Sequence, residues 1–91
     1  MAIQLVMQEQ GAALRGDLTV YEVESFKTLC APWLDKAEQA LWDLSGIEHL
    51  DTAGLQALLM WQHFSGVDYV NPSKSVLEGS ALYQLPVQWH D

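Results

Sequence analysis

The spacing of apolar side chains changes repeatedly along this 91-residue chain, and these changes restrict its fold more than any other feature. Residues 13–20 alternate between apolar and polar, which is typical of a half-buried strand. In residues 23–34 apolar side chains recur every third or fourth position, which is helical spacing. Residues 40–44 form a short apolar run typical of central strands, and residues 50–64 return to helical spacing. The pattern therefore predicts that strands and helices alternate.

Weaker signals at both ends complete this pattern. Residues 2–7 predict a first strand, which a turn joins to the second. Residues 67–70 predict another strand, and Ser73 or Ser75 can cap a third helix after it. Residues 87–89 could add a last strand at the edge of the sheet or pack as a tail.

The predicted order is β-β-α-β-α-β-α, which describes a single α/β domain spanning residues 1–91. Strands that alternate with helices after an opening hairpin imply a mixed sheet with parallel crossover connections. We expect a sheet of four to five strands with about three helices.

Individual residues mark the ends of the helices. Pro32 lacks a backbone N–H, so the first helix should kink or restart there. Asp51 and Thr52 are both good N-cap residues for the second helix, and Gly66 suits its C-terminal end. Pro86 should stop the third helix.

The second helix should contribute much of the core. Leu55, Leu58 and Leu59 are spaced to face the sheet, and Leu44 lies on the apolar strand that they would cover. These four leucines are therefore expected to be largely buried. Trp61 lies on the same helix, and two interpretations remain open: a core residue or an exposed anchor for a partner.

The charge balance excludes several functions. The net charge is −8, with four basic side chains against twelve acidic ones. Such a chain is not expected to bind nucleic acid or an anionic membrane surface, because both need clustered Lys and Arg. A basic protein partner suits it better. The first residues lack the features of a signal peptide, and no apolar run is long enough to span a membrane, so a cytoplasmic location is expected.

Residues that usually carry catalysis or bind metals are sparse. Cys30 is the only cysteine and is interpreted as a small buried hydrophobe. His49, His63 and His90 have no ligand-like spacing with carboxylates, so no metal site is predicted. There is no glycine-rich phosphate loop and no recognisable pair of nucleophile and base. We therefore predict no catalytic residues, no cofactor and no enzyme activity.

One segment, Asp43 to Leu59, closely resembles the signature of STAS domains, the family named for sulphate transporters and anti-sigma factor antagonists. That signature is a strand ending in Asp-Leu-Ser, a short loop, and Asp-Ser/Thr-x-Gly-Leu at the start of a helix, which Asp51 to Leu55 match in full. Gly16 to Thr19 and Val70 to Ser73 resemble other turns of the family. Leu82 to Pro86 are similar to the end of the STAS subunit of bacterial phospholipid-transport ABC complexes.

The resemblance implies a role for Thr52. In anti-sigma factor antagonists the Ser or Thr of this motif is the residue that a partner kinase phosphorylates. Elementary physics agrees, because a helix N-terminus presents free N–H groups that favour negative charge. A phosphate on Thr52 would leave the fold intact while a partner packed there was expelled, especially with Asp51 adjacent. The other interpretation of Thr52 is an ordinary N-cap.

The resemblance also places the partner-binding surface. We expect a partner to dock over the loop from residue 46 to residue 51 and the first turns of the second helix. Gly54 has no side chain, so a partner could approach the first turn closely. The predicted docking residues are Asp51, Thr52, Ala53, Gly54, Gln56 and Trp61.

The favoured function is a non-enzymatic regulator, and two versions remain open. One is an anti-sigma-antagonist-like switch controlled by phosphorylation of Thr52, with a serine/threonine kinase, an anti-sigma factor or a chemotaxis-type signalling protein as partner. The alternative is a STAS subunit that stabilises the ABC-transporter ATPase of a phospholipid-transport complex, which the resemblance at residues 82–86 favours. A small enzyme is the rival from another class.

Overall fold

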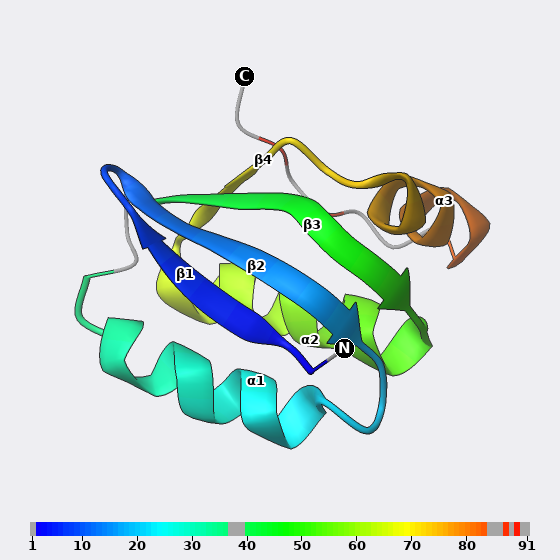
Figure 1. Ribbon diagram of the computed structural model, residues 1–91, viewed down its shortest axis with the longest axis horizontal. Coiled ribbons are helices and arrows are strands. Elements are labelled where there is room, and N and C mark those ends of the chain that lie inside the picture. Colours follow the sequence, from blue (N-terminus) through cyan, green and yellow to red (C-terminus); the bar gives the residue numbers. More distant parts are fainter. Residues whose placement is uncertain (1, 37–39, 84–86, 88, 90–91) are drawn as a thin grey trace.

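The computed structural model describes residues 2–36, 40–83, 87 and 89, which form one sheet with helices packed against it (Figure 1). The four strands are β1 (Gln4–Gln8), β2 (Gly11–Leu18), β3 (Leu41–Leu50) and β4 (Asp68–Val70). The helices are α1 (Val23–Cys30), the short 3-10 helix η1 (Ala31–Trp33), α2 (Thr52–Ser65) and α3 (Lys74–Tyr83). The predicted order of strands and α-helices is confirmed.

The sheet is mixed and has the strand order β1-β2-β3-β4. β1 and β2 form an antiparallel hairpin in which Gln8 pairs with Gly11. β2 pairs in parallel with β3, and β3 with β4, so α1 and α2 each lie within a crossover connection. Both helices cover the same face of the sheet (Figure 1).

Strand β3 is much longer than the sequence predicted. An apolar strand ending near Leu44 and a loop from residue 46 to residue 51 were expected, whereas β3 continues to Leu50. This second half pairs with β2 as far as Leu18, across two register shifts. Ser45 and Gly46 suggested a turn, but the neighbouring strand supplies ladder partners for this stretch. Residues 46–50 of the expected docking loop are therefore part of the sheet.

Several helix ends follow the sequence signals. α1 ends at Cys30, and the 3-10 turn that contains Pro32 follows it. Gly66 ends α2 with a left-handed backbone conformation, φ 74°. At the start of α3 the Val76 N–H donates to Oγ of Ser73 over 3.2 Å, so Ser73 is the capping serine. The expected stop at Pro86 lies outside the described residues.

The core forms between the sheet and the helices. Leu44, Leu55 and Leu58 are fully buried as predicted, whereas Leu59 is half-buried and packs against the core. Trp61 is 8% exposed, and its ring lies 5.6 Å from that of Trp42. Of the two interpretations of Trp61, a core residue or an exposed anchor for a partner, the core residue is therefore correct.

The ends of the described chain add two details. Val20, which continues the predicted alternation of β2, lies beyond the strand and is 58% exposed. Trp89 makes a parallel bridge to Tyr69 on β4, whereas Gln88, in the middle of the expected last strand, lies outside the described residues. Among the described residues, no helix is both long and apolar enough to cross a membrane.

Candidate protein-docking site

The carboxylate of Asp51 holds the start of α2 in place. Its Oδ1 accepts a hydrogen bond from the Gly54 N–H over 2.8 Å, which is the N-cap interaction. Its Oδ2 accepts from the Val20 N–H over 2.9 Å, which ties α2 to the turn after β2. Of the two N-cap candidates, the structure therefore uses Asp51.

Thr52 is the first residue of α2 rather than its cap. The side chain is half-buried, and no hydrogen bond among the described residues involves its hydroxyl group. The N-cap interpretation of Thr52 is therefore wrong. The hydroxyl lies at the end of the helix where backbone N–H groups lack partners within the helix, and it is not used to hold the helix in place.

The structure gives Gly54 a different role from the one expected. Gly54 is buried, and a Cβ built on it would collide with the backbone carbonyl oxygen of Leu18. Its missing side chain lets α2 approach β2, so it does not open a surface to a partner. The expected docking role of Gly54 is incorrect because this face of α2 is turned toward the sheet.

The other predicted docking residues divide between surface and core. Gln56 is exposed, and Ala53 is half-buried beside it on the outer side of α2. Trp61 is packed in the core and cannot be a protruding anchor. Asp51, Thr52, Ala53 and Gln56 thus remain as the accessible part of the predicted site.

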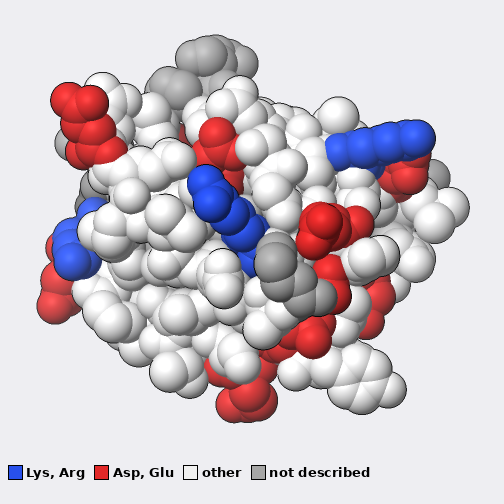
Figure 2. All heavy atoms as spheres, in the orientation of Figure 1, with Lys and Arg blue, Asp and Glu red and all other residues white. Residues whose placement is uncertain are grey.

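The end of the sheet next to Thr52 is acidic. Asp17 at the end of β2 bonds His49 at the end of β3, with 2.7 Å between Oδ1 and Nδ1. Glu22 accepts from both the N–H and the hydroxyl of Thr19, at 2.9 and 2.6 Å. No Lys or Arg occurs between Gly46 and Ser73 in the sequence. Figure 2 shows acidic side chains gathered at the lower right, over this end of the molecule.

The chemistry of the described residues offers little for catalysis. Cys30 is 4% exposed, and burial raises the pKa of its thiol to about 12, so the thiolate nucleophile is scarce near neutral pH. Among the described residues, no group of three or more His, Cys, Asp and Glu side chains could hold a metal ion.

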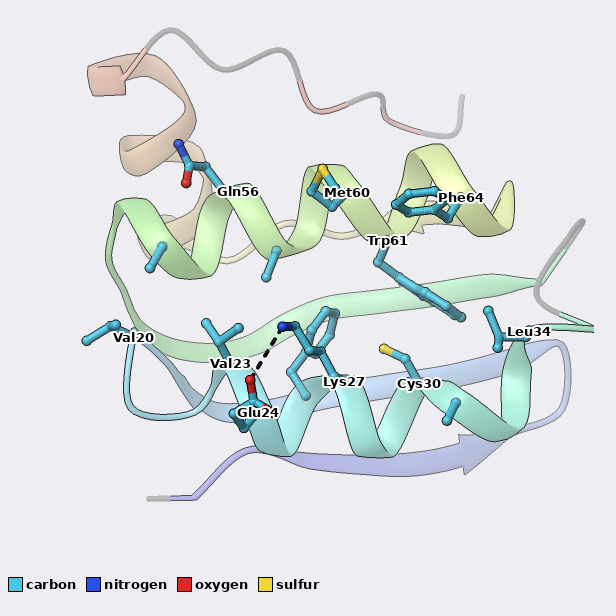
Figure 3. Close-up of a pocket in the computed structure, with 14 residues that line it drawn as sticks. Val20, Val23, Glu24, Lys27, Cys30, Leu34, Gln56, Met60, Trp61 and Phe64 are labelled. Carbon is cyan, nitrogen blue, oxygen red and sulfur yellow. Dashed lines mark hydrogen bonds and ion pairs between the residues drawn. The ribbon is translucent and has the colours of Figure 1, made fainter.

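A groove beside Thr52 was missed by the sequence prediction. It lies between α1 and α2, has a volume of about 720 Å³, and includes Ala53 and Gln56 in its lining (Figure 3). The available signal was the absence of Asp, Glu, Lys and Arg from the whole of α2. A helix on a protein surface normally has charged residues on its outer face.

Comparisons with known proteins agree with this architecture. A family model described as "Mlab, STAS domain" matches residues 1–85. Among solved structures, the chain resembles the anti-sigma factor antagonist SpoIIAA in its unphosphorylated form, with a TM-score of 0.64. That match covers 99% of this chain and 88% of the other, and the sequences are 18% identical, so it shows the fold alone. No curated protein matches the chain. The predicted STAS resemblance and the mixed α/β fold are confirmed.

Proposed function

Because this chain belongs to the STAS domain family, we propose that it is a non-enzymatic regulatory protein that binds a partner protein around Thr52, at the N-terminus of α2. One observation carries the proposal: Asp51 makes both hydrogen bonds that fix the start of α2, and the Thr52 hydroxyl has no partner among the described residues. The fold itself therefore does not account for a polar side chain at position 52.

The favoured version is a switch like that of anti-sigma factor antagonists, controlled by phosphorylation of Thr52. A phosphate there would lie at the positive end of the α2 dipole, so the helix would tolerate it. If a partner were docked there, the phosphate would have to give up its hydration water, and the negative charge of Asp51 beside the phosphate would add electrostatic repulsion. The partner in this version is a serine/threonine kinase, an anti-sigma factor or a chemotaxis-type signalling protein.

A second candidate is a subunit that binds the ATPase of a phospholipid-transport ABC complex. It is supported by the resemblance of residues 82–86 to the STAS subunit of such complexes. Two of these residues are described at the end of α3, and both are exposed: Leu82 at 73% and Tyr83 at 43%. In this version the surface around Thr52 docks without being modified.

The first experiment compares partner capture by full-length variants. Thr52→Glu should retain its thermal midpoint but lose the partner that the wild-type protein captures, because a charge buried in the contact is unpaired. Thr52→Ala should keep capture in the switch version. Thr28→Glu is the matched control, since Thr28 is exposed on α1, away from the start of α2. Retained capture by Thr52→Glu would remove Thr52 from the docking surface.

The second experiment separates the two versions. The chain is incubated with ATP and any serine/threonine kinase encoded by a neighbouring gene, and the phosphate is located by mass spectrometry. One phosphate on Thr52 supports the switch, whereas phosphate only on Ser73 or Ser75 contradicts the assigned residue. No phosphate, together with co-purification of an ABC ATPase, favours the transporter subunit.

A further inference from the structure

A β-turn next to the start of α2 presents two large apolar side chains to solvent. The turn spans residues 19–22, between β2 and α1, and its central residues are Val20 and Tyr21. Val20 is 58% exposed and Tyr21 is 89% exposed, so neither side chain is used to build the core. The centres of turns are normally occupied by Gly, Pro, Asn, Asp or Ser. Neither turn formation nor packing therefore explains the choice of residue at these two positions.

Hydrogen bonds hold this turn in one conformation. The Glu22 N–H donates to the Thr19 carbonyl oxygen over 2.9 Å, and Oε1 of Glu22 accepts from the Thr19 N–H over 2.9 Å and from its hydroxyl over 2.6 Å. The Tyr21 N–H donates to Oγ1 of Thr19 over 3.3 Å, and the Val20 N–H donates to Asp51. The backbone N–H groups of all four turn residues are thus bonded. A side chain on such a fixed backbone loses little additional freedom when a partner binds it.

The turn and the start of α2 form one continuous surface. The carboxylate of Asp51 joins them, because one oxygen caps α2 and the other lies 2.9 Å from the Val20 nitrogen. Val20 and Ala53 also line the same hollow. Figure 3 shows Val20 pointing outward at the end of the molecule where α2 begins. A partner that docks on Thr52 therefore meets the turn as well.

The chemistry of this surface favours an apolar partner pocket. Its centre consists of uncharged side chains: Val20, Tyr21, Thr52 and Ala53. Exposed aromatic residues are common anchors of protein interfaces, since a tyrosine ring supplies a large contact area and has only two side-chain torsions to fix. An uncharged contact also agrees with the expected effect of Thr52→Glu, because a charge placed in it has no partner.

A second copy of this chain suits the surface less well. In a twofold contact the same patch faces itself, so Asp17, Glu22 and Asp51 of one copy approach the same residues of the other. Each copy also carries a net charge of −8, which opposes the contact. An anionic membrane surface is disfavoured by the same charge. A different protein is therefore the occupant that the surface fits.

We propose that Tyr21, with Val20 beside it, is an anchor that inserts into an uncharged, apolar pocket of the partner protein docked around Thr52. The fixed turn holds the tyrosine ring ready for this contact. The inference rests on the proposed function and deepens it, since it names a further contact residue and the chemistry of the partner surface that receives it.

The first test places a photo-reactive phenylalanine at position 21 of the full chain, in the cells that express it. Position 7 is the matched control, because Met7 is 64% exposed and pairs with Ala12, at the end of β2 remote from the turn. We expect position 21 to cross-link another protein at an apolar surface site. The inference is overturned by the absence of a cross-linked protein, by a cross-link to a second copy, by attachment at a charged surface, or by the same product from position 7.

The second test titrates the purified cross-linked protein against full-length variants. Tyr21→Ala should weaken binding at least about thirtyfold, as expected for an aromatic anchor, while its thermal midpoint stays at the wild-type value. Tyr21→Phe retains the ring and should bind within about threefold of wild type. Met7→Ala is the control and should bind normally. Wild-type affinity of Tyr21→Ala would overturn the inference, and an equal loss in Tyr21→Phe would show that the ring is not the anchor.

The third test concerns the rigidity of the turn. Thr19→Val keeps the shape of the side chain but removes its hydrogen bonds with Glu22 and with the Tyr21 N–H. With Tyr21 itself unchanged, binding should weaken at least about threefold, because the looser turn must be ordered when the partner binds. Wild-type affinity of Thr19→Val would show that the fixed turn does not contribute to docking.

The same assays distinguish this inference from the proposal on Thr52. Loss of partner capture by Thr52→Glu with normal binding by Tyr21→Ala would uphold the Thr52 site and reject the anchor. Loss by Tyr21→Ala with normal capture by Thr52→Glu would uphold docking at the turn and reject docking centred on Thr52. Loss in both variants supports a single surface.

Discussion

Gly54 lies directly against the backbone carbonyl of Leu18, with no space for a Cβ between them. This contact joins the first turn of α2 to the end of β2 and sets the distance between the helix and the sheet. The position of Thr52, two residues earlier, depends on it.

Gly54→Ala should therefore destabilise the domain by about 1–3 kcal/mol, because the obstacle is backbone and cannot turn aside. The free energy of unfolding, measured in urea, tests this. Gly79→Ala in α3 is the matched control, since its Cβ would meet only the side chain of Leu50, at 3.2 Å. In Gly79→Ala the higher helix propensity of alanine should offset the cost of the close contact with Leu50, so the stability should change little. Equal stability of Gly54→Ala and wild type would show that α2 is not held at this distance.

Asp51→Ala and Thr52→Ala should differ clearly in stability. Removing the Asp51 carboxylate breaks bonds to Gly54 and Val20 and should cost about 1–2 kcal/mol. Thr52→Ala breaks no hydrogen bond among the described residues and gains helix propensity, so its stability should change by less than about 0.5 kcal/mol. Urea unfolding of both variants measures the difference. A larger cost for Thr52→Ala would contradict the assignment of Asp51 as the cap.

Cys30 should be unreactive in the folded protein. Because burial raises the pKa of its thiol from 9.0 to about 12, the native state keeps this proton after the unfolded chain loses it. The stabilisation by the protonated Cys30 thiol is therefore fully present below about pH 9 and declines as the pH rises toward 12. A thiol reagent at pH 8 should modify Cys30 only after denaturant is added. Rapid labelling of the native protein would show that the thiol is accessible.

The ionised carboxylate of Asp43 should stabilise the folded protein at pH values above its pKa. Burial alone would raise its pKa, but hydrogen bonds from Ser45 and Asn71, at 2.8 and 3.0 Å, hold the pKa below the usual value of 3.8. The stabilisation by the Asp43 carboxylate is fully present at pH values above the usual pKa. It is lost as the pH falls through the lower pKa that Asp43 has in the folded protein.

Asp43→Asn should thus cost about 1 kcal/mol at neutral pH, and the difference from wild type should shrink under acidic conditions. Unfolding curves recorded along a pH series measure it. A difference that stays constant down to pH values well below 3.8 would show that the Asp43 charge is not responsible.

The sequence by itself determined the features that depend on neighbouring residues. The break before Pro32 follows from its missing N–H, and the end of α2 at Gly66 follows from a backbone conformation that glycine adopts readily. Periodicity was enough for the order of the elements, and the motif from Asp43 to Leu59, together with the pattern around it, indicated the family.

Only the tertiary structure decided the features that depend on distant partners. β3 extends to Leu50 because β2 pairs with it, and Gly54 is needed because Leu18 lies against it. The choice of Asp51 over Thr52 as cap depends in part on the Val20 N–H, 31 positions away in the chain. The groove forms because α1 and α2 cover the same face of the sheet and leave the outer face of α2 open between them. Local sequence spacing cannot specify such contacts, since they are made between segments that only the fold brings together.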